Sequence, residues 1–216
     1  MKPVIAVDGH AGSGKGTISK KIARSFGLAY LDSGLLFRIA GFLNLEVENF
    51  KKISIQDLIF QINSLPFNAL RSEEISAKAS VIAKNSEIRK KIKNLIREFA
   101  ENPGPQYMGS IIDGRDIGTS VIPEAICKLF FTADIKIRAK RRFKTLRHTN
   151  SNLTLQEVLS NMESRDKQDS SRSDSPLTFS DQYILIDTSN DSIRRTFIKV
   201  SKIVEKSLIS AVTLYK

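Results

Sequence analysis

The sequence contains very little cysteine or histidine and no long hydrophobic run. Cys127 is its one cysteine, so the chain cannot depend on disulfides or on an all-cysteine metal site. Its two histidines, His10 and His148, stand far apart, which argues against a metal site made of histidines. The N-terminal apolar run, residues 3–7, is too short for the core of a signal peptide or for a membrane span. We therefore expect a cytoplasmic protein that makes no contact with a membrane.

The remaining composition is ordinary for a globular protein, apart from its charge. The 216 residues are 41% hydrophobic and 26% charged, which excludes disordered, collagen-like and coiled-coil chains and fits one domain. Lysine and arginine number 34 against 23 acidic residues, which gives a net charge of +11. This excess indicates an anionic partner: nucleic acid, an acidic membrane surface or a phosphorylated small molecule.

Short apolar runs alternate with amphipathic segments along the chain. Strands are expected at 3–7, 28–31, 110–113, 128–132 and 183–187, and helices at about 17–26, 35–43, 88–101, 135–146, from 154 and from 192. Two stretches lack such a pattern: residues 44–70 are expected to be variable and polar, and residues 164–175 exposed and mobile. The alternation predicts the α/β class, with a parallel sheet covered by helices on both faces.

Residues 9–17 carry a phosphate-binding loop of the pattern G-x-x-x-x-G-K. Glycines are needed there because successive backbone N–H groups must point at phosphate oxygens in conformations that a side chain would block. A glycine-rich turn that binds nothing is the weaker reading, since a strand precedes the motif and a helix follows it. Contacts with ATP are expected from Gly9, His10, Ala11, Gly12, Ser13, Gly14, Lys15, Gly16 and Thr17.

The residues after Lys15 bear on the metal. A serine or threonine usually follows this lysine and reaches Mg²⁺, but Gly16 stands here and the hydroxyl of Thr17 is displaced by one position. Lys-Gly-Thr resembles the nucleoside monophosphate kinases. That resemblance implies that Mg²⁺ is held mainly by phosphates and water, with Thr17 the one candidate side-chain ligand.

Three further motifs follow in order along the chain. They are Asp32-Ser33-Gly34 with Arg38, then Asp-Gly-Arg-Asp-x-Gly-Thr at 113–119, and then Arg-Asp-x-x-Asp-x-x-Arg at 165–172. Together with the loop, this set resembles the bacterial cytidylate kinases over essentially the whole chain. The resemblance implies a three-layer P-loop fold whose five parallel strands have the order 2-3-1-4-5. It also implies a core (about 1–35, 100–150 and 176–216), a nucleotide-acceptor subdomain (about 36–99) and a lid (about 151–175).

The same resemblance implies the substrates and the role of each charged residue. ATP would be the phosphoryl donor, with Mg²⁺, and CMP or dCMP the acceptor. The implied CMP-binding residues are Ser33, Arg38, Ser80, Arg89, Arg115, Asp116, Arg165, Asp169 and Arg172, while Arg141 and Arg142 would lie near ATP. The implied catalytic groups are Lys15, Arg115, Arg165 and Arg172. The family also implies a monomer.

The sequence departs from the family pattern at three places. His10 replaces a proline common in the phosphate loop, and Gln168 and Ser170 stand where relatives often carry arginine. Less positive charge on the lid predicts slower turnover, or compensation by Arg141, Arg142 or Lys167. The segment between Leu65 and Arg71 is short for the family, so selectivity among CMP, dCMP and UMP remains open.

Two other readings compete with a CMP kinase. Kinases of UMP, AMP or shikimate share the loop and the sheet, although adenylate kinases carry Asp-Gly-Phe-Pro-Arg where this chain has Asp113 to Asp116. A nucleic-acid-binding P-loop protein would use the basic run 136–147, which contains no acidic residue. No set of stacking aromatics accompanies that run, so no specific nucleic-acid partner is expected.

Overall fold

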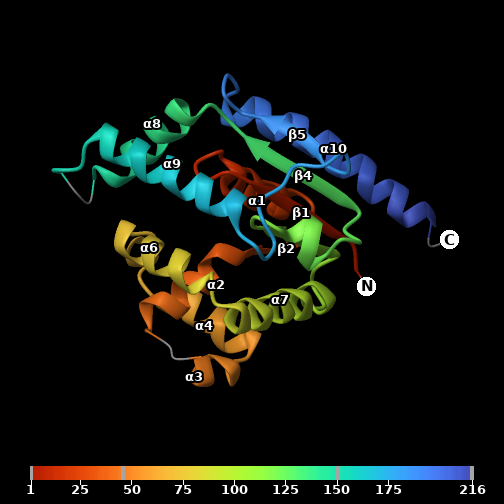
Figure 1. Ribbon diagram of the computed structural model, residues 1–216. Coiled ribbons are helices and arrows are strands. Elements are labelled where there is room, and N and C mark those ends of the chain that lie inside the picture. Colours follow the sequence, from red (N-terminus) through yellow and green to blue (C-terminus); the bar gives the residue numbers. More distant parts are fainter. Residues whose placement is uncertain (1, 45–46, 149–150, 215–216) are drawn as a thin grey trace.

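A five-stranded parallel sheet, in the order β2-β3-β1-β4-β5, runs through the centre of the molecule (Figure 1). The computed structural model describes residues 2–44, 47–148 and 151–214. Its strands are β1 (Val4–Gly9), β2 (Leu28–Asp32), β3 (Gly109–Asp113), β4 (Cys127–Thr132) and β5 (Ile184–Asp187). The expected strands and the expected order are confirmed. Because all pairs are parallel, the carboxyl ends of the strands meet at one edge, where α/β proteins bind their ligands.

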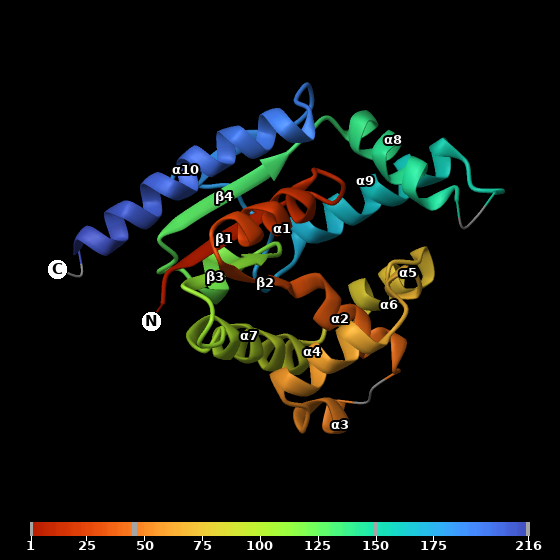
Figure 2. The ribbon, with the colours of Figure 1, turned by 180° about the vertical axis from the view of Figure 1, so that it is seen from behind.

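Helices bury both faces of the sheet. On one face, α1 (Lys15–Ser25) and α10 (Ile193–Leu214) pack on side chains of β1 and β4, and both helices lie in front of the strands in Figure 2. On the other face, α2 (Ser33–Phe42) and α7 (Ser86–Glu101) cover β1 and β3. The apolar stripes that predicted these helices are the buried ones, so the three-layer arrangement is confirmed.

Residues 47–70 are helical, and the expectation of a variable polar stretch there is wrong. They form α3 (Val47–Lys51), α4 (Ile55–Ser64) and α5 (Phe67–Leu70), and α6 (Glu73–Ile82) follows. Phe50, Leu58 and Leu70 are fully buried beside α2 and α7. The helices α3 and α5 are too short to show a periodic apolar face in the sequence. The helix α4 does show one, through Ile55, Leu58, Ile59 and Ile62, and the expectation overlooked it. A second signal was the capping box at the start of α4, in which Ser54 accepts from the backbone N–H of Asp57.

The expectation for residues 164–175 is also corrected in part. Residues 164–171 continue α9 (Leu155–Ser171), which packs on α8 (Ile135–Leu146) through Ala139, Val158 and Met162. One side of this segment is exposed, whereas Arg165, Asp166 and Asp169 on the other side are partly buried. Charged residues that pair inside a cleft have the same low hydropathy as charged residues on an exposed surface. The sequence alone therefore could not show that this side of the segment is partly buried.

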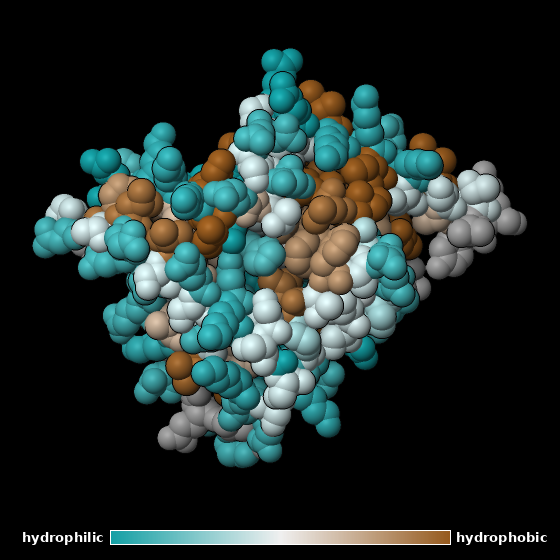
Figure 3. All heavy atoms as spheres, turned by 45° about the horizontal axis from the view of Figure 1, so that its top comes forward, coloured by the Kyte–Doolittle hydropathy of each residue, from teal (hydrophilic) through white to brown (hydrophobic). Residues whose placement is uncertain are grey.

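The part of the chain that the structure describes includes no helix of sufficient length and apolarity to span a bilayer. On the face shown in Figure 3, apolar side chains gather along β5 and α10. Ile184, Leu185, Ile193 and Ile198 are all exposed there. In Figures 1 and 2, the pair α8–α9 and the helix α6 stand on opposite sides of the carboxyl edge of the sheet.

Candidate active site

A cavity of about 1330 Å³ opens at the carboxyl edge of the sheet, between the phosphate loop, the helices α2, α6 and α7, and the helix α9. Most of the expected site residues line it: Ala11, Gly12, Ser13, Gly14, Lys15, Gly16, Thr17, Ser33, Arg38, Ser80, Arg89, Arg115, Asp116, Arg141, Arg142, Arg165, Asp169 and Arg172. Gly9 and His10 are not among its lining residues. The fold therefore brings together residues from six segments that are remote in sequence.

Glycine is required at two positions of the phosphate loop for different reasons. Gly9 has φ +138°, and a Cβ there would lie 2.0 Å from the carbonyl oxygen of Phe131. Gly14 has φ +87° and begins α1, which places the helix N-terminus at the cavity. The loop thus turns its backbone N–H groups and the positive end of the helix dipole toward the space that phosphates would occupy.

Lys15 is held by a carboxylate from the next motif. Its ammonium group lies 3.3 Å from Asp113, which also accepts a 2.9 Å hydrogen bond from the Tyr30 hydroxyl. Burial lowers the pKa of Lys15, aided by the nearby Arg115, and burial raises the pKa of Asp113. A Cβ on Gly16 would lie 3.1 Å from the Asp113 carboxylate. A side chain at this position would therefore require the Asp113 carboxylate to shift by a few tenths of an ångström.

The oxygen donors available to Mg²⁺ are few. Among residues 2–44, 47–148 and 151–214, no group of three His, Cys, Asp or Glu side chains could hold a metal ion. Asp113 is paired with Lys15, and Asp32 is paired with Arg71. Thr17 is exposed and lines the cavity, so its hydroxyl is within the space that a nucleotide would fill. This donor set suits a hard cation whose remaining ligands come from phosphates and water.

Arg38 and Ser33 lie on the side of the cavity formed by α2, α6 and α7. The Arg38 guanidinium donates to the Leu70 carbonyl and to the Ser76 hydroxyl, each at 2.9 Å. Burial, together with the nearby Arg165, lowers its pKa to about 9. The Ser33 hydroxyl donates to the backbone carbonyl of Asp113 at 2.8 Å. These contacts orient both side chains before any substrate binds.

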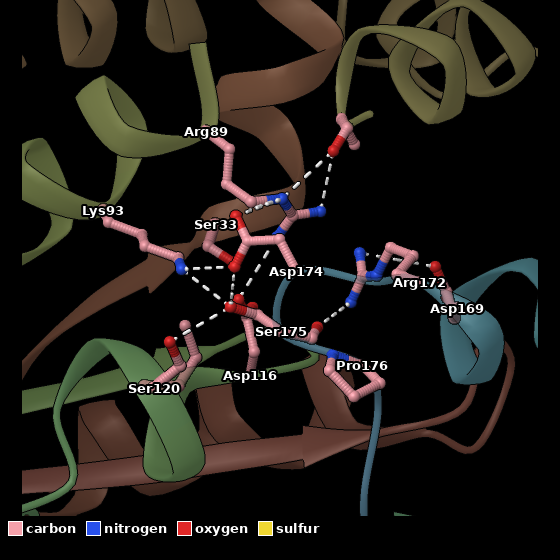
Figure 4. Close-up of polar contacts among 12 residues, drawn as sticks. Ser33, Arg89, Lys93, Asp116, Ser120, Asp169, Arg172, Asp174, Ser175 and Pro176 are labelled. Atoms are coloured by element: carbon pink, nitrogen blue, oxygen red, sulfur yellow. Dashed lines mark hydrogen bonds and ion pairs between the residues drawn. The ribbon is translucent and has the colours of Figure 1, made fainter. Parts of the chain in front are cut away.

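Arg89 and Asp116 form a buried ion pair on the same side (Figure 4). The Arg89 guanidinium lies 3.2 Å from the Asp116 carboxylate and also donates twice to the Ala83 carbonyl. Burial raises the pKa of Asp116, and the cations around it oppose that rise. Ser80 lines the cavity as well, with its hydroxyl donating to the Ser76 carbonyl at 3.0 Å.

The motif at 165–172 contributes three charged groups to the cavity. Arg115 donates to Asp169 at 2.8 Å, and Arg172 lies 3.7 Å from the same carboxylate and donates to the Ser175 carbonyl (Figure 4). The Nε atoms of Arg165 and Arg172 are buried, with no hydrogen-bond partner among the described residues. Burial lowers the pKa of Arg165, and Arg115 lowers it further. Clustered arginines with unused donors are suited to binding phosphate.

Arg141 and Arg142, the two arginines expected near ATP, contact different partners. Arg141 donates to the hydroxyl and the carbonyl of Thr188, beside the phosphate loop, whereas Arg142 pairs with Glu73 at 2.7 Å. Since Glu73 begins α6, this ion pair joins α8 to α6. The His10 ring packs edge-on against Phe130, and burial lowers its pKa.

The comparison with known proteins agrees with this geometry. A family model described as cytidylate kinase matches residues 5–206. The chain belongs to the cytidylate kinase family. It is 38% identical over 211 residues to a cytidylate kinase of Azorhizobium caulinodans, covering 94% of this chain and 98% of that protein. It is 39% identical over 215 residues to one of Thermosipho melanesiensis, covering 94% and 96%.

Solved structures agree on the fold alone. A shikimate kinase from Bacteroides thetaiotaomicron matches with a TM-score of 0.52 at 15% identity, covering 95% of this chain and 99% of that one. An uncharacterized protein from Eubacterium ventriosum matches with a TM-score of 0.54 at 16% identity, covering 97% and 99%.

Four charged residues of this cytidylate kinase family member were not assigned from its sequence. Asp32 and Asp113 each begin one of the sequence motifs, so the sequence did indicate that they belong to the site, where they pair with Arg71 and Lys15. Arg71 and Arg138 belong to no motif, so nothing in the sequence indicated their contacts. Arg138 is almost fully buried: it pairs with Asp166 at 2.7 Å and donates to the Ala11 carbonyl, which ties α9 to the phosphate loop. Of the two lid substitutions, Gln168 lines the cavity, whereas Ser170 is exposed and donates to the Asp166 carbonyl.

Proposed function

We propose that this protein transfers the γ-phosphoryl group of ATP to CMP or dCMP, giving ADP and CDP or dCDP. The observation that carries the proposal is one cavity that holds a phosphate loop on one side and, on the other, the buried arginines of the cytidylate kinase motifs. Two polyanions can meet there because arginine and lysine offset their repulsion. The names of the relatives in this family support the same reaction.

Lys15 and the loop would bind the ATP phosphates. The ammonium group would leave Asp113 for the β- and γ-phosphates, and its burial strengthens this contact because water screens it little. Thr17, phosphate oxygens and water would hold Mg²⁺, which when bound neutralises phosphate charge. Arg141 and Arg142 lie where they can contact the nucleotide.

The acceptor would occupy the side lined by α2, α6 and α7. We propose that Arg38, Arg89 and Arg115 bind its phosphate, and that Ser33, Ser80 and Asp116 contact the base. Arg165 and Arg172 would lie between the phosphates of the two substrates. A carboxylate can accept from the exocyclic amine of cytosine, which uracil lacks. Asp169 would contact the ribose. Positioning and charge neutralisation then carry the in-line transfer, with no need for a covalent intermediate.

The subdomain boundaries given above belong to the same proposal, with α2–α7 as the acceptor subdomain and α9 as part of the lid. We further propose that the enzyme acts as a monomer in the cytoplasm. Closure of the lid would expel water, which otherwise would hydrolyse ATP.

A coupled assay of ADP release tests the proposal. CMP, dCMP, UMP, AMP and shikimate are supplied in parallel with ATP and Mg²⁺, and an assay without acceptor measures hydrolysis. We expect the highest kcat/KM with CMP or dCMP. Activity with AMP or shikimate alone would overturn the assignment.

A further inference from the structure

Asp8 is a fully buried carboxylate that the proposed reaction does not use. It lies near the end of β1, directly before the phosphate loop. One oxygen accepts from the backbone N–H of Ile117 at 2.9 Å. The other accepts from the backbone N–H of Gly118 at 2.8 Å and from the Tyr183 hydroxyl at 2.6 Å. Three donors from two remote segments thus converge on one side chain.

The atoms that Asp8 binds belong to the turn that carries two site residues. Arg115 and Asp116 face the cavity, and the next two residues direct their N–H groups to Asp8. Asp116 thus lines the cavity, while the N–H of the very next residue, Ile117, points away from it to the buried Asp8. A second tie, from the Gly114 N–H to the Val7 carbonyl at 2.8 Å, fixes the other end of the turn to β1.

The packing around this carboxylate leaves the turn little freedom. A Cβ on Gly118 would lie 2.7 Å from the Tyr183 hydroxyl and 3.1 Å from the Lys128 side chain. Residues Ile117–Val121 then form a short π-helix, which is rare and which sequence propensity does not predict. The backbone at Ile117 and Gly118 is thus held by hydrogen bonds to Asp8 and by close contact with β4 and Tyr183.

We propose that Asp8 is a positioning residue, which fixes the Arg115–Asp116 turn against β1 and so sets the affinity for the acceptor nucleotide. As far as it concerns CMP, the inference rests on the proposed function. Asp8 touches no substrate and acts through Arg115 and Asp116. Its role is thus distinct from that of the phosphate loop that follows it in sequence.

Asp8→Asn tests the positioning role with little change in shape. The amide keeps one acceptor oxygen but places an NH₂ group against a backbone N–H, so one of the two backbone bonds is lost. Because hydrogen bonds to a buried charge are strong, we expect KM for CMP to rise about tenfold and KM for ATP to change less than about threefold. Tyr183→Phe removes one donor and leaves both backbone bonds, so a smaller rise, about threefold, is expected.

Ser110→Ala is the matched control. Ser110 is fully buried on β3 opposite Val4 of β1, and its hydroxyl has no hydrogen-bond partner among the described residues. We expect both KM values to stay at the parental level. Equal changes in the two KM values of Asp8→Asn, or no change in either, would overturn the proposal. If Asp8→Asn does not fold, the same comparison is made with Tyr183→Phe, and an unchanged KM for CMP there overturns it.

The pH profile gives a second readout. Burial raises the pKa of Asp8 to about 6, with Asp116 as the facing like charge, while the bonds from Gly118, Tyr183 and Ile117 oppose the rise. The other charged group nearby, Lys128, donates to Gln182. Protonation of Asp8 below this pH would remove an acceptor, so KM for CMP should rise toward acid. The phosphate of CMP also ionises at about pH 6. Tyr183→Phe removes a bond that lowers the pKa of Asp8, so the rise in KM that Asp8 causes should begin at higher pH, while the part caused by the CMP phosphate stays in place. An unchanged profile would contradict a link between Asp8 and CMP binding.

Amide hydrogen exchange measures the clamp, that is, the hold of Asp8 on the backbone N–H groups of Ile117 and Gly118, without any substrate. In the parental protein, the N–H groups of Ile117 and Gly118 should exchange slowly, and in Asp8→Asn at least about tenfold faster, since a protecting bond is lost. The N–H groups of β3 serve as the internal reference. If the parental protein does not phosphorylate CMP, the proposed function fails while this measurement still tests the clamp. Unchanged exchange in Asp8→Asn overturns the clamp.

Discussion

At the scale of single residues, three cations of the cavity are each paired with a carboxylate from a remote part of the chain. Lys15 is paired with Asp113, Arg89 with Asp116 and Arg115 with Asp169. The sequence motifs predicted which cations meet in the site. They did not predict these pairs, because the carboxylates come from other strands and helices, and only the fold brings them within hydrogen-bond distance.

Arg172→Lys should reduce kcat by about 100-fold, since an ammonium group cannot replace a planar guanidinium that bonds through several N–H groups. Arg172 uses one donor on the Ser175 carbonyl, and its buried Nε has no partner among the described residues. Steady-state kinetics with CMP measure the effect. Arg195→Lys, on the exposed side of α10, is the control and should leave kcat unchanged. Equal kcat values for Arg172→Lys and the parental enzyme would remove Arg172 from the proposed catalytic set.

Gly9→Ala and Gly27→Ala separate steric contact from backbone conformation. Gly27 has φ +59° with open space around it, so its substitution should cost about 1 kcal/mol of unfolding free energy. Gly9 combines a positive φ with the 2.0 Å approach to the Phe131 carbonyl, so a loss of about 3 kcal/mol or more is expected. Urea denaturation measures both values. Equal losses would show that the loop relaxes around a Cβ.

At the scale of elements, the sequence predicted those helices and strands that have their own periodic apolar face. The helix α7 shows this well, because Ile88, Ile92, Leu95 and Ile96 recur on one side and are all buried. The short helices α3 and α5 each have one buried side chain among those described, Phe50 and Leu70, which is too few to form a pattern, whereas the apolar face of α4 was present in the sequence and was overlooked. The end of α9 was expected to be exposed because its inward-facing residues, Arg165, Asp166 and Asp169, are charged and give no apolar pattern.

The segment after α9 is tied to α7 by a cluster of polar contacts (Figure 4). Lys93 donates to Asp174 at 3.0 Å and to Ser175 at 2.7 Å, and Ser175 is 3.1 Å from Ser120. Ser175 has φ +52°, which is uncommon for serine. The carbonyl of this residue holds Arg172, so α7 and the Arg172 side chain are connected through it.

A double-mutant cycle of Lys93→Gln and Asp174→Asn tests this tie. The Asp174 side chain is half exposed, so each single change should raise KM for CMP by only about two- to fivefold. The double variant should lose less than the product of the two single effects, because both changes remove the Lys93–Asp174 contact, although Lys93 also donates to Ser175 and Asp174 also lies 3.8 Å from Arg89. Lys90→Gln, on the exposed side of the same helix, serves as control. Additive effects would mean that the two residues act independently.

At the scale of the whole molecule, the net charge of +11 divides into two groups. One group lines the cavity and belongs to the proposed reaction. The other lies on outer helix faces, where Lys136, Lys140 and Lys144 of α8 and Arg194, Lys199 and Lys202 of α10 are exposed. Three members of the basic run 136–147, namely Arg138, Arg141 and Arg142, are used in internal contacts. The run is therefore less available to nucleic acid than its sequence indicated.

The ion pair between Arg142 and Glu73 spans the cavity from α8 to α6, and under the proposed function it would compete with ATP for Arg142. Glu73→Gln should therefore tighten ATP binding by about two- to fivefold, the usual size of a partly exposed ion pair. Isothermal titration calorimetry with ATP measures the change. Glu98→Gln, an exposed change on α7 at a residue that does not line the cavity, should have no effect. Weaker ATP binding by Glu73→Gln would mean that the bridge supports the donor site.

The pairing of Lys15, Arg89 and Arg115 with internal carboxylates has a consequence for how the enzyme responds to salt. Because these three cations already have fixed counterions, they have little need of anions from the buffer. Nucleotide phosphates would then replace Asp113 and Asp169 rather than chloride, and few ions would be released on binding. Affinity for ATP and CMP should accordingly vary less with ionic strength than the charge of the protein suggests, because the exchange takes place within buried pairs that salt screens little.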